Sequence, residues 1–354
     1  MEIHMTQTIA LKQRPEDTKL GFGQHFTDHM FLMDHLPDKG WSDPRIVPYG
    51  DLPMDPATMV FHYGQAIFEG LKAYRTEKGK IQLFRPQMNF RRFNNSALRL
   101  CIPKLDEAFA LESLKALVTV DKDWVPSSEG TSLYLRPTII ATDPYLGVRA
   151  SNTYLYFVIL SPVGAYYPQG FSPVKIWVTT SFVRAVRGGV GEAKTAANYA
   201  ASLLAGQRAH EHGYTQVLWL DGVERKWVEE VGSMNIFFVI DDAIVTPALN
   251  GSILPGITRD SVIHLAKHWG IPVSTRQVAI DEIFEAHAMG RLTECFGTGT
   301  AAVISPVGEL RYKDSVITIG SGKVGPMAQR FYNAITDIQY GRAEDPFGWI
   351  VPVC

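Results

Sequence analysis

The chain has 354 residues, a length that fits about two domains with sizeable hydrophobic cores. Apolar residues make up 46% and charged residues 20%, which is typical of a soluble globular protein, and the net charge of -2 provides no basic surface for nucleic acid or membrane lipid. The three cysteines form no CxxC pair, so they indicate neither a disulfide framework nor a zinc site and favour a reducing, cytoplasmic compartment.

The first half of the chain predicts strands followed by helices. Residues 59–64 and 71–75 alternate apolar and polar side chains, as short strands do when they are joined by Gly- and Pro-bearing turns. The other elements predicted in this half are helices at residues 88–99 and 105–120 and strands at residues 131–140 and 154–160.

A Pro- and Gly-bearing stretch at residues 163–173 is the best candidate for an interdomain linker. It would separate a small domain, residues 1–162, from a large one, residues 174–354. The large domain is predicted to contain strands at residues 174–180, 216–220, 227–231 and 236–240 and helices at residues 196–212 and 257–269. The alanine-rich start of the first of these helices predicts close packing on a neighbour, and the whole pattern is α+β.

One lysine stands apart from the other charged residues of the chain. Lys194 lies among glycines and alanines, with Glu192 and Arg187 as its nearest charged neighbours. The three preceding glycines would let the backbone pass close to a bulky group. A lysine partly withdrawn from water disfavours its charged form, so its free amine can act as a nucleophile and form a Schiff base. The alternative is a lysine that extends from a helix start into solvent.

Two other segments are suited to binding an anion. Residues 254–260 form a turn that opens a helix, so the amides of Ile257 and Thr258 would point outward at the positive end of the helix dipole. Residues 296–302 are predicted to form a second loop with exposed amides and hydroxyls. Together with a reactive lysine, the two segments suggest an anionic aldehyde cofactor, pyridoxal 5'-phosphate.

A carboxylate lies within the apolar stretch at residues 228–237. Burial of Glu230 would be costly without a cation beside it, and the protonated ring nitrogen of the cofactor would be such a cation. Glu230 would then keep the cofactor ring an electron sink. A glutamate at the rim of the fold, next to a solvated Glu229, is equally compatible with this stretch.

Three further patterns do not support other cofactors. Residues 189–194 lack the third glycine of a dinucleotide fingerprint, and residues 320–324 lack the flanking residues of a phosphate loop. His25, His29 and His35 alternate with aspartates but do not have the spacing of metal ligands. We therefore expect no metal site.

Several long motifs resemble those of the branched-chain amino acid aminotransferases, which are fold-type IV pyridoxal-phosphate enzymes. The resemblance extends over nearly the whole chain, and its most specific parts are residues 26–30, 61–74 and 322–326. It implies an α+β fold-type IV enzyme with two α/β domains and the cofactor at their interface. It also implies a homodimer that acts on small-molecule substrates and binds neither nucleic acid nor membrane.

The resemblance assigns cofactor-binding roles to individual residues. Lys194 would bind the cofactor aldehyde covalently and move the proton between substrate and cofactor. Tyr199 would contact the phenolic oxygen of the cofactor, and Glu230 its ring nitrogen. The residues implied at or near the phosphate are Arg92, Ser233, Ile257, Thr258 and Thr300.

A substrate pocket follows from the same resemblance. The amides of Thr300 and Ala301 would bind the α-carboxylate, and Arg136 would help to accept the side-chain carboxylate of glutamate. Branched side chains offer mainly dispersion and area burial for recognition, which suits aromatic walls. The walls would consist of Tyr63, Phe68, Tyr134 and Tyr166, with Val148 supplied by a second subunit.

The expected reaction is a reversible ping-pong transfer of the α-amino group of L-leucine, L-isoleucine or L-valine to 2-oxoglutarate. The alternatives are a D-amino acid transaminase, an aminodeoxychorismate lyase, or a non-catalytic protein that uses the cofactor site as a sensor. Some animal relatives carry a CxxC redox pair after the Gly-Thr loop, where this chain has Ala302 and Ser305. A thiol switch is therefore not expected at that loop.

Overall fold

A computed structural model describes residues 1–166 and 170–354 of the chain. The chain divides into two compact units. The first comprises Met1–Pro168, Ala193–Ala196 and Asp337–Cys354, and the second comprises Gln169–Glu192 and Ala197–Thr336. Residues 167–169, which the sequence places in the interdomain linker, lie outside the described residues.

The first unit is built on one sheet. Its strands are β1 (His4–Met5), β2 (His29–Leu36), β3 (Gly40–Pro48), β4 (Ala66–Phe68), β5 (Leu71–Arg75), β6 (Ile81–Phe84), β7 (Ser132–Ala141), β8 (Tyr154–Val163) and β18 (Ile350–Pro352). They lie in the order β1-β3-β2-β8-β7-β5-β6-β18, and β4 pairs with β7. Burial alternates along β7, so Leu133 and Leu135 face the core while Tyr134 and Arg136 lie on the opposite face.

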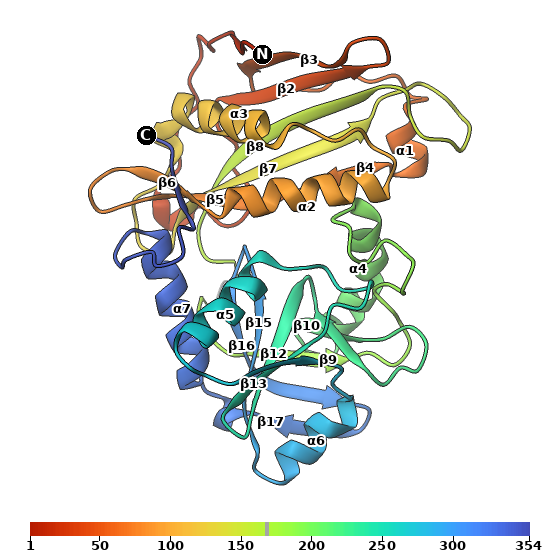
Figure 1. Ribbon diagram of the computed structural model, residues 1–354, viewed down its shortest axis with the longest axis vertical. Helices are drawn as coiled ribbons and strands as arrows, with labels where there is room; N and C mark the ends of the chain where they lie inside the picture. Colours follow the sequence, from red (N-terminus) through yellow and green to blue (C-terminus); the bar gives the residue numbers. More distant parts are fainter. Residues whose placement is uncertain (167–169) are drawn as a thin grey trace. The chain divides into compact units, whose positions relative to one another are not determined.

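Helices cover the core face of this sheet (Figure 1). The helices are α1 (Met59–Tyr63), α2 (Pro86–Arg99) and α3 (Glu107–Val120), with the 3-10 helices η1 (Asp17–Lys19) and η2 (Lys122–Trp124). The predictions of α2 and α3 are confirmed, with starts that differ by two residues. Pro86 suits the first position of α2, where its missing N–H needs no partner. Asp106 caps α3 by accepting a hydrogen bond from the N–H of Phe109 at 2.7 Å.

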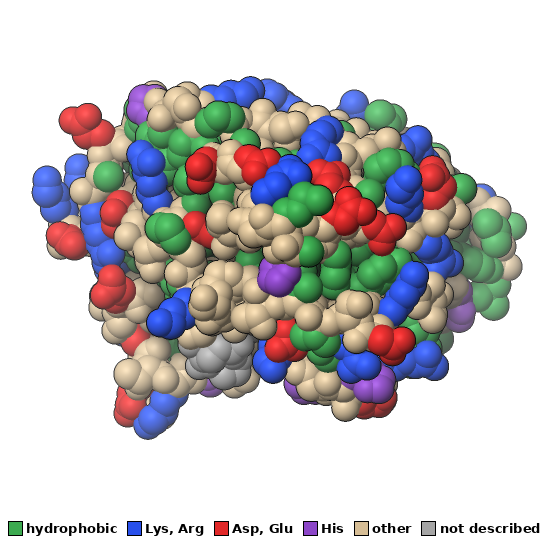
Figure 2. Space-filling view, turned by 90° about the horizontal axis from the view of Figure 1, so that it is seen from below, with side chains coloured by type: hydrophobic (Ala, Val, Ile, Leu, Met, Phe, Trp, Pro, Cys, Tyr) green, Lys and Arg blue, Asp and Glu red, His purple; other side chains and the backbone are tan. Residues whose placement is uncertain are grey.

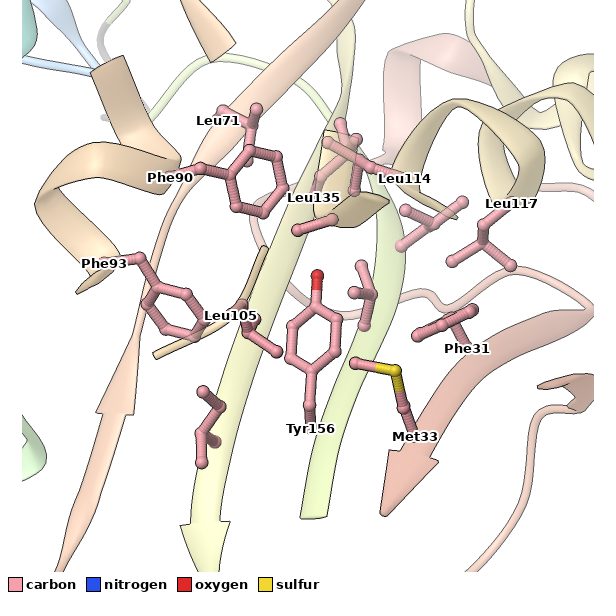
Figure 3. Packing of buried hydrophobic residues seen from close by; sticks show 14 of the residues in the cluster. Phe31, Met33, Leu71, Phe90, Phe93, Leu105, Leu114, Leu117, Leu135 and Tyr156 are labelled. Carbon is pink, nitrogen blue, oxygen red and sulfur yellow. The ribbon is translucent and has the colours of Figure 1, made fainter. Parts of the chain in front are cut away.

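The core of the first unit lies between the sheet and the helices α2 and α3 (Figure 3). Phe90 and Phe93 of α2 and Leu114 of α3 are buried around Tyr156 of β8. Each such side chain contributes roughly 1.5–3 kcal/mol when it leaves water. Burial also raises the pKa of the Tyr156 hydroxyl, because the phenolate would lose its hydration. This packing fixes β7, whose opposite face carries the predicted site residues Tyr134 and Arg136.

One strand prediction is wrong. Residues 59–64 form the short helix α1, whereas the strand predicted at residues 71–75 is confirmed as β5. Gly64 ends α1 with a φ of +61°, and its N–H donates to the carbonyl of Val60 at 3.1 Å. Glycine adopts this left-handed conformation without the steric penalty of a side chain. An alternation of six residues is too short to separate a strand from a short helix.

The second unit contains a closed set of strands. Its strands are β9 (Val174–Val178), β10 (Gln216–Leu220), β11 (Val228–Val231), β12 (Met234–Ile240), β13 (Ala243–Pro247), β14 (Val273–Arg276), β15 (Leu292–Gly299), β16 (Val303–Tyr312) and β17 (Ser315–Thr318). Strand β11 pairs with both β10 and β12, so the path β11-β10-β9-β16-β15-β12 returns to its start. The four strands predicted here are confirmed, with ends that shift by at most two residues.

Helices surround these strands. They are α4 (Ala196–Glu211), α5 (Ile257–His268), α6 (Ile280–Ala288), α7 (Pro326–Gln339) and the 3-10 helix η3 (Gly320–Gly322). The prediction of α5 is confirmed, because Val262, Leu265 and Ala266 are buried on one face. Helix α4 packs through Ala205 and Ala209, which are buried against Tyr214, Val217 and Trp219. Its other face is open, since Leu203 and Leu204 are 70% and 50% exposed. A run of alanines favours a helix but does not define which face is buried.

Two segments belong to a different unit from the one that the sequence predicted. Ala193–Ala196 and Asp337–Cys354 are part of the first unit, whereas the predicted boundary places both in the large second domain. The last segment joins the first unit because β18 pairs with β6 in an antiparallel register. Tyr340 also donates a hydrogen bond to the carbonyl of Thr131 at 2.7 Å. Local sequence patterns contain no information about pairings over such separations.

Within residues 1–166 and 170–354, no helix is both long and apolar enough to cross a membrane. Figure 2 shows basic and acidic side chains mixed over the face in view.

Candidate active site

The backbone of Lys194 is held against strand β4 within the first unit. Its N–H donates to Ser96 Oγ at 2.9 Å, and its carbonyl accepts from the N–H of Phe68 at 3.0 Å. The next residue, Thr195, forms an antiparallel bridge with Ile67. These contacts order the backbone of the predicted catalytic lysine as part of the sheet, although its neighbours in sequence are small and flexible.

Two cationic side chains contact the ring of Phe68. Lys194 Nζ lies 4.9 Å from the ring centroid, and Arg136 Cζ lies 4.7 Å from it. Arg136 is also 5.3 Å from the ring of Tyr134 and donates a long hydrogen bond of 3.4 Å to its hydroxyl. Arg136 Nε is buried and has no hydrogen-bond partner among the described residues. A half-buried cation with a buried, unused donor is suited to binding an anion.

Phe22 belongs to the same aromatic cluster, although no motif in the sequence singles it out. Its ring lies 5.1 Å from that of Tyr134 and 5.2 Å from that of Tyr166, edge-on in both cases. Such pairs contribute about 0.5–1.5 kcal/mol beyond area burial. The flanking Gly21 and Gly23 have φ of +58° and +72°, so the Gly-Phe-Gly triplet was the available signal. Phe22, Tyr134 and Tyr166 form one continuous aromatic wall.

Arg92, a predicted phosphate ligand, is buried in α2 and forms a two-point ion pair with Glu69. The distances are 2.7 Å from Nε to Oε1 and 2.8 Å from Nη2 to Oε2, and Asn89 donates to the same carboxylate at 2.8 Å. Burial would raise the pKa of Glu69, but Arg92 and Lys194 outweigh this effect and hold its pKa below the usual value. Glu69 therefore links two predicted site residues electrostatically, a role that the sequence did not indicate.

Lys72 is a second lysine of the first unit in an unusual environment. It lies on β5 directly opposite Tyr134 in the antiparallel register, and its side chain is buried. Desolvation lowers the pKa of Lys72 from 10.5 to about 8. The charged form of this lysine therefore destabilises the folded chain at neutral pH.

We expect Lys72→Met to raise the free energy of unfolding at pH 7. Because the folded pKa of Lys72 is about 8 and the unfolded value 10.5, the unfolded state binds more protons between these values, so stability rises with pH in that window. Below it the buried charge costs the fold about 3 kcal/mol. Urea denaturation from pH 7 to 10 should show the rise in the wild type and not in the variant.

Lys175→Met is the matched control for this experiment, because the side chain of Lys175 is 59% exposed and paired with Glu309 at the surface. It should reproduce the wild-type dependence on pH. The same pH dependence in Lys72→Met and wild type would contradict the assignment of the stability change to Lys72.

Glu230 is buried on β11 of the second unit, which decides against the place at the rim that the sequence left equally open. Its Oε1 accepts from the N–H of Leu254 at 2.7 Å, and Asn235 Nδ2 lies 3.5 Å from the same oxygen. Its Oε2 lies 2.9 Å from Nε of Arg184. The cation that a buried carboxylate requires is thus present within the chain, 46 residues earlier in the sequence, where no local pattern could indicate it.

The neighbouring Glu229 is buried rather than solvated. Its Oε1 accepts hydrogen bonds from Ser252 Oγ and, at 3.3 Å, from Asn250 Nδ2. Successive side chains of a strand point to opposite faces, so the two glutamates of β11 occupy different environments. Both are nevertheless tied to the loop that precedes α5.

The start of α5 is shaped by Gly256. A Cβ at this position would overlap Asn235 Oδ1 and lie 3.3 Å from Arg259 Cβ, so glycine is needed for this close approach. Gly256 gives α5 no side-chain cap, and Ile257 and Thr258 form its first turn. An uncapped helix start is suited to a phosphate, because its amides and the helix dipole both favour an anion.

The predicted loop at residues 296–302 is shorter in the structure. Strand β15 continues to Gly299 and β16 begins at Val303, so only Thr300 and its two successors form the turn. Val303 has a φ of +61°. This conformation costs an L-residue roughly 1–2 kcal/mol, and it is least compatible with a β-branched side chain. The strained residue directly follows the turn that contains Thr300 and Ala301, and such strain is common beside functional loops.

A row of polar side chains crosses the strands next to this turn. Glu230 on β11 pairs with Asn235 on β12, which pairs with Thr298 on β15. Paired residues of neighbouring strands lie on the same face of a sheet. Thr298 Oγ1 is buried and has no hydrogen-bond partner in the described parts of the chain. An unused hydroxyl in this row is an available donor for a bound ligand.

The remaining predicted site residues lie at different depths. Tyr199 is half-buried in the first turn of α4, and Ser233 is exposed in the turn between β11 and β12. Tyr63 at the end of α1 is 41% exposed, and Val148 is 89% exposed. Their roles in binding cofactor or substrate stay predictions.

The histidine- and aspartate-bearing segment of the first unit has a structural role. His29 Nδ1 lies 2.7 Å from Asp121 Oδ1, and its Nε2 accepts from the N–H of Thr8 at 3.1 Å. Asp28 accepts from the indole N–H of Trp124 at 2.7 Å. Among the described residues, no group of three His, Cys, Asp or Glu side chains could hold a metal ion.

Comparison with known proteins identifies the family. The amino-transferase class IV family matches residues 66–310. The branched-chain-amino-acid aminotransferase 2 of Bacillus subtilis (strain 168) is 60% identical over 351 residues, which cover 99% of this chain and 97% of that protein. The chain belongs to the branched-chain amino acid aminotransferases of class IV. A probable branched-chain-amino-acid aminotransferase of Staphylococcus aureus (strain N315) is 57% identical to this aminotransferase over 345 residues, covering 97% and 96% of the two chains.

Solved structures confirm the predicted fold-type IV architecture of this aminotransferase. The branched-chain amino acid aminotransferase of T.th. with pyridoxamine 5'-phosphate has a TM-score of 0.76 at 29% identity, covering 93% of this chain and 100% of that one. The branched-chain amino acid aminotransferase from Escherichia coli has a TM-score of 0.73 at 28% identity, covering 92% and 99%.

Proposed function

We propose that this aminotransferase transfers the α-amino group of L-leucine, L-isoleucine or L-valine reversibly to 2-oxoglutarate, giving branched-chain 2-oxo acids and L-glutamate by a ping-pong reaction. The observation that carries the proposal is the ring of Phe68, which contacts both the amine of Lys194 and the guanidinium of Arg136. An aromatic wall suits the branched side chains, and a cation suits the second carboxylate of glutamate. The names of the Bacillus and Staphylococcus relatives support the same activity.

The residues of this chain fit pyridoxal 5'-phosphate. Lys194 supplies an amine, Glu230 a buried carboxylate for the ring nitrogen, and the uncapped start of α5 a place for the phosphate. The unused hydroxyl of Thr298 is a further donor. When bound, this cofactor supplies an aldehyde that condenses with amines and a ring that withdraws electrons from the substrate Cα.

Lys194 has two tasks in the proposed reaction. Its amine first retains the cofactor, and once displaced by the substrate it acts as the base that holds and moves the proton of the substrate Cα. Tyr199 donates to the phenolic oxygen, and Glu230 keeps the ring nitrogen protonated. The phosphate is bound by Arg92, Ser233, Ile257, Thr258 and Thr300.

The substrate side of the proposal uses the aromatic cluster described above. Tyr63, Phe68, Tyr134 and Tyr166 exclude water from the branched side chain, whose full burial contributes about 1.5–3 kcal/mol. Arg136 binds the side-chain carboxylate when glutamate or 2-oxoglutarate replaces the branched substrate. The amides of Thr300 and Ala301 bind the α-carboxylate that both substrates share.

Substrate assays test this function directly. Protein reconstituted with pyridoxal 5'-phosphate should turn over L-leucine with 2-oxoglutarate, and L-leucine alone should change the cofactor absorbance, because each half-reaction can proceed alone. Parallel assays with D-alanine and aminodeoxychorismate test the other fold-type IV activities. Turnover of D-alanine alone would refute the proposal, and a coloured protein whose spectrum L-leucine leaves unchanged would favour a sensor.

We further propose that the enzyme is a cytoplasmic homodimer in which Val148 completes the site of the partner. Val148 and Leu146 are 89% and 67% exposed in the single chain, and clustered exposed apolar residues often mark an interface. The three cysteines are unpaired, as a reducing compartment favours. Sedimentation should give a dimer at micromolar concentration, and cell fractionation should recover the activity in the soluble fraction. A monomer at all concentrations would contradict the assembly.

We expect Gly70→Ala to impair substrate binding. A Cβ at Gly70 would overlap the hydroxyl oxygen of Tyr134 and lie 2.8 Å from its Cζ, so the ring must leave its position in the aromatic wall. Displacement of a positioning group by about 1 Å can cost up to 10²-fold in activity, and we expect KM for L-leucine to rise at least about tenfold. Gly206→Ala is the control, because a Cβ there meets nothing within 4 Å. An unchanged KM in Gly70→Ala would argue against a role for Tyr134 in the pocket.

A further inference from the structure

Arg184 is a buried arginine in direct contact with Glu230. The two side chains are 7% and 4% exposed, and Arg184 Nε lies 2.9 Å from Glu230 Oε2. Arg184 Nε nevertheless has no aligned hydrogen-bond partner in the described residues. The contact is therefore mainly Coulombic, and its strength depends on both groups being charged.

The guanidinium is fixed by two loops of the second unit. Its Nη2 donates to the carbonyl of Gly191 at 3.1 Å and to the carbonyl of Ser252. A Cβ at Gly191 would overlap the Ser252 carbonyl and lie 2.7 Å from Ala185 Cβ, so glycine is required where the loops meet. One loop leads toward Lys194 and the other toward α5 along the chain. Arg184 therefore holds Glu230 together with the segments that precede two other proposed cofactor contacts.

We propose that Arg184 is a positioning residue that keeps Glu230 ionised and oriented, so that the proton between Glu230 and the cofactor stays on the ring nitrogen. This inference rests on the proposed function, in which Glu230 binds that nitrogen. Leu254 contributes to the orientation, because its N–H donates to Glu230 Oε1 at 2.7 Å.

The physical reason is the cost of charge in a dry site. Without a further cation, a neutral carboxylic acid beside a neutral ring is favoured over a buried ion pair, because both charges lose their hydration. The Arg184 guanidinium contacts the Glu230 carboxylate directly. A ring nitrogen bound to that carboxylate would lie farther from the guanidinium than the carboxylate does. The attraction between the guanidinium and the carboxylate is therefore stronger than the repulsion between the guanidinium and a charged ring. Arginine suits this task, because it remains charged beside Glu230 while its Nη2 donates to two carbonyls.

The test measures the pH at which the visible absorbance of the bound cofactor changes, in holoenzyme without substrate. Arg184→Gln removes the charge, whereas Arg184→Lys retains it. A ring that has lost its charge makes the nitrogen joining cofactor and lysine more basic, so the midpoint should rise by roughly one to three units in Arg184→Gln. Arg184→Lys should shift the midpoint less than half as far. Equal shifts in the two variants, or no shift in Arg184→Gln, would overturn the proposal.

Two further variants separate charge from structure. Arg259 is also a buried arginine of the second unit, and its Nη2 donates to the carbonyl of Pro247 at 3.0 Å. Arg259→Gln should lower the thermal midpoint without changing the absorbance midpoint. If Arg259→Gln shifted the absorbance midpoint as far as Arg184→Gln does, the shift would follow from the loss of any buried arginine. That result would overturn the proposal.

Glu230→Gln distinguishes failure of the inference from failure of the proposed site. If Glu230→Gln raises the absorbance midpoint and Arg184→Gln does not, only the inference fails. If Glu230→Gln has the wild-type midpoint, the ring-nitrogen role of Glu230 and the inference fail together. If Arg184→Gln does not fold, the test uses the double variant Arg184→Gln with Glu230→Gln. This double variant has no buried carboxylate without a partner at this position. Its midpoint should equal that of Glu230→Gln, and a different midpoint would overturn the proposal.

Discussion

Lys194→Ala should abolish covalent attachment of pyridoxal 5'-phosphate and lower kcat by about a thousandfold or more, since a general acid–base group contributes roughly 10²–10⁴. The backbone of Lys194 is fixed by Ser96 and Phe68, and its amine lies 4.9 Å from the Phe68 ring centroid. The variant should therefore lose an amine in a defined position, with little change in fold. Borohydride reduction followed by peptide mass spectrometry should find the pyridoxyl group on Lys194 in the wild type and on no lysine in the variant.

Lys72 is the most demanding control for this experiment. It lies in the same unit, and because burial lowers its pKa to about 8, part of its population is uncharged near neutral pH. An unprotonated amine is the nucleophilic form. The Lys72→Met variant should retain the label on Lys194. A pyridoxyl group on Lys72 in Lys194→Ala would show that the catalytic lysine has been assigned to the wrong position.

Arg92→Met should weaken cofactor binding at least tenfold and destabilise the protein by about 3–5 kcal/mol, because it leaves the buried carboxylate of Glu69 without its main partner. Glu69→Gln should cause a loss of stability of similar size. The double variant should recover much of it, since a neutral buried pair carries no uncompensated charge. Cofactor affinity should stay low in both Arg92→Met and the double variant, because both lack the charged hydrogen bond to phosphate. Such a bond contributes about 1.5–3 kcal/mol.

Urea denaturation and equilibrium dialysis separate these two effects. The pKa of Glu69 is lowered in the folded state, so the stability it contributes is present above its unfolded pKa and is lost as the pH falls through the folded value. The difference in free energy of unfolding between the wild type and Glu69→Gln should therefore become smaller as the pH falls. Urea denaturation of both proteins at neutral and at acid pH measures this difference. If Arg92→Met bound the cofactor as tightly as the wild type, Arg92 would not bind the phosphate. Its role would then be limited to pairing with Glu69.

The sequence predicted those features that depend on local pattern. Helix α5 was predicted because Val262, Leu265 and Ala266 recur at helical spacing, and the structure buries all three. The strand that carries Glu230 followed from the apolar residues around it, although the stretch left burial and a place at the rim equally open. The start of α5 after Pro255 and Gly256 followed from turn chemistry. In each case, the residues that determine the outcome lie within a few positions of one another.

The features that the sequence did not predict depend on pairings between distant segments. Arg184 contacts Glu230 across 46 positions, and Glu69 contacts Arg92 across 23. Phe22 joins the aromatic wall only because the chain brings it to Tyr134. A single sequence specifies a buried carboxylate's need for a cation but not which arginine supplies it. For that reason the predicted site omitted Arg184 and Glu69, which contact two of its members.

Strand β18 has a practical consequence for preparing the protein. It covers the edge of β6, and the ladder continues to the last residue, where the carbonyl of Cys354 accepts from the N–H of Ile81 at 2.8 Å. An affinity tag fused directly after Cys354 would start on a hydrogen-bonded sheet edge. Removing residues 350–354 would leave β6 open to edge-to-edge aggregation. Shortened forms of the protein should therefore keep residues 350–354.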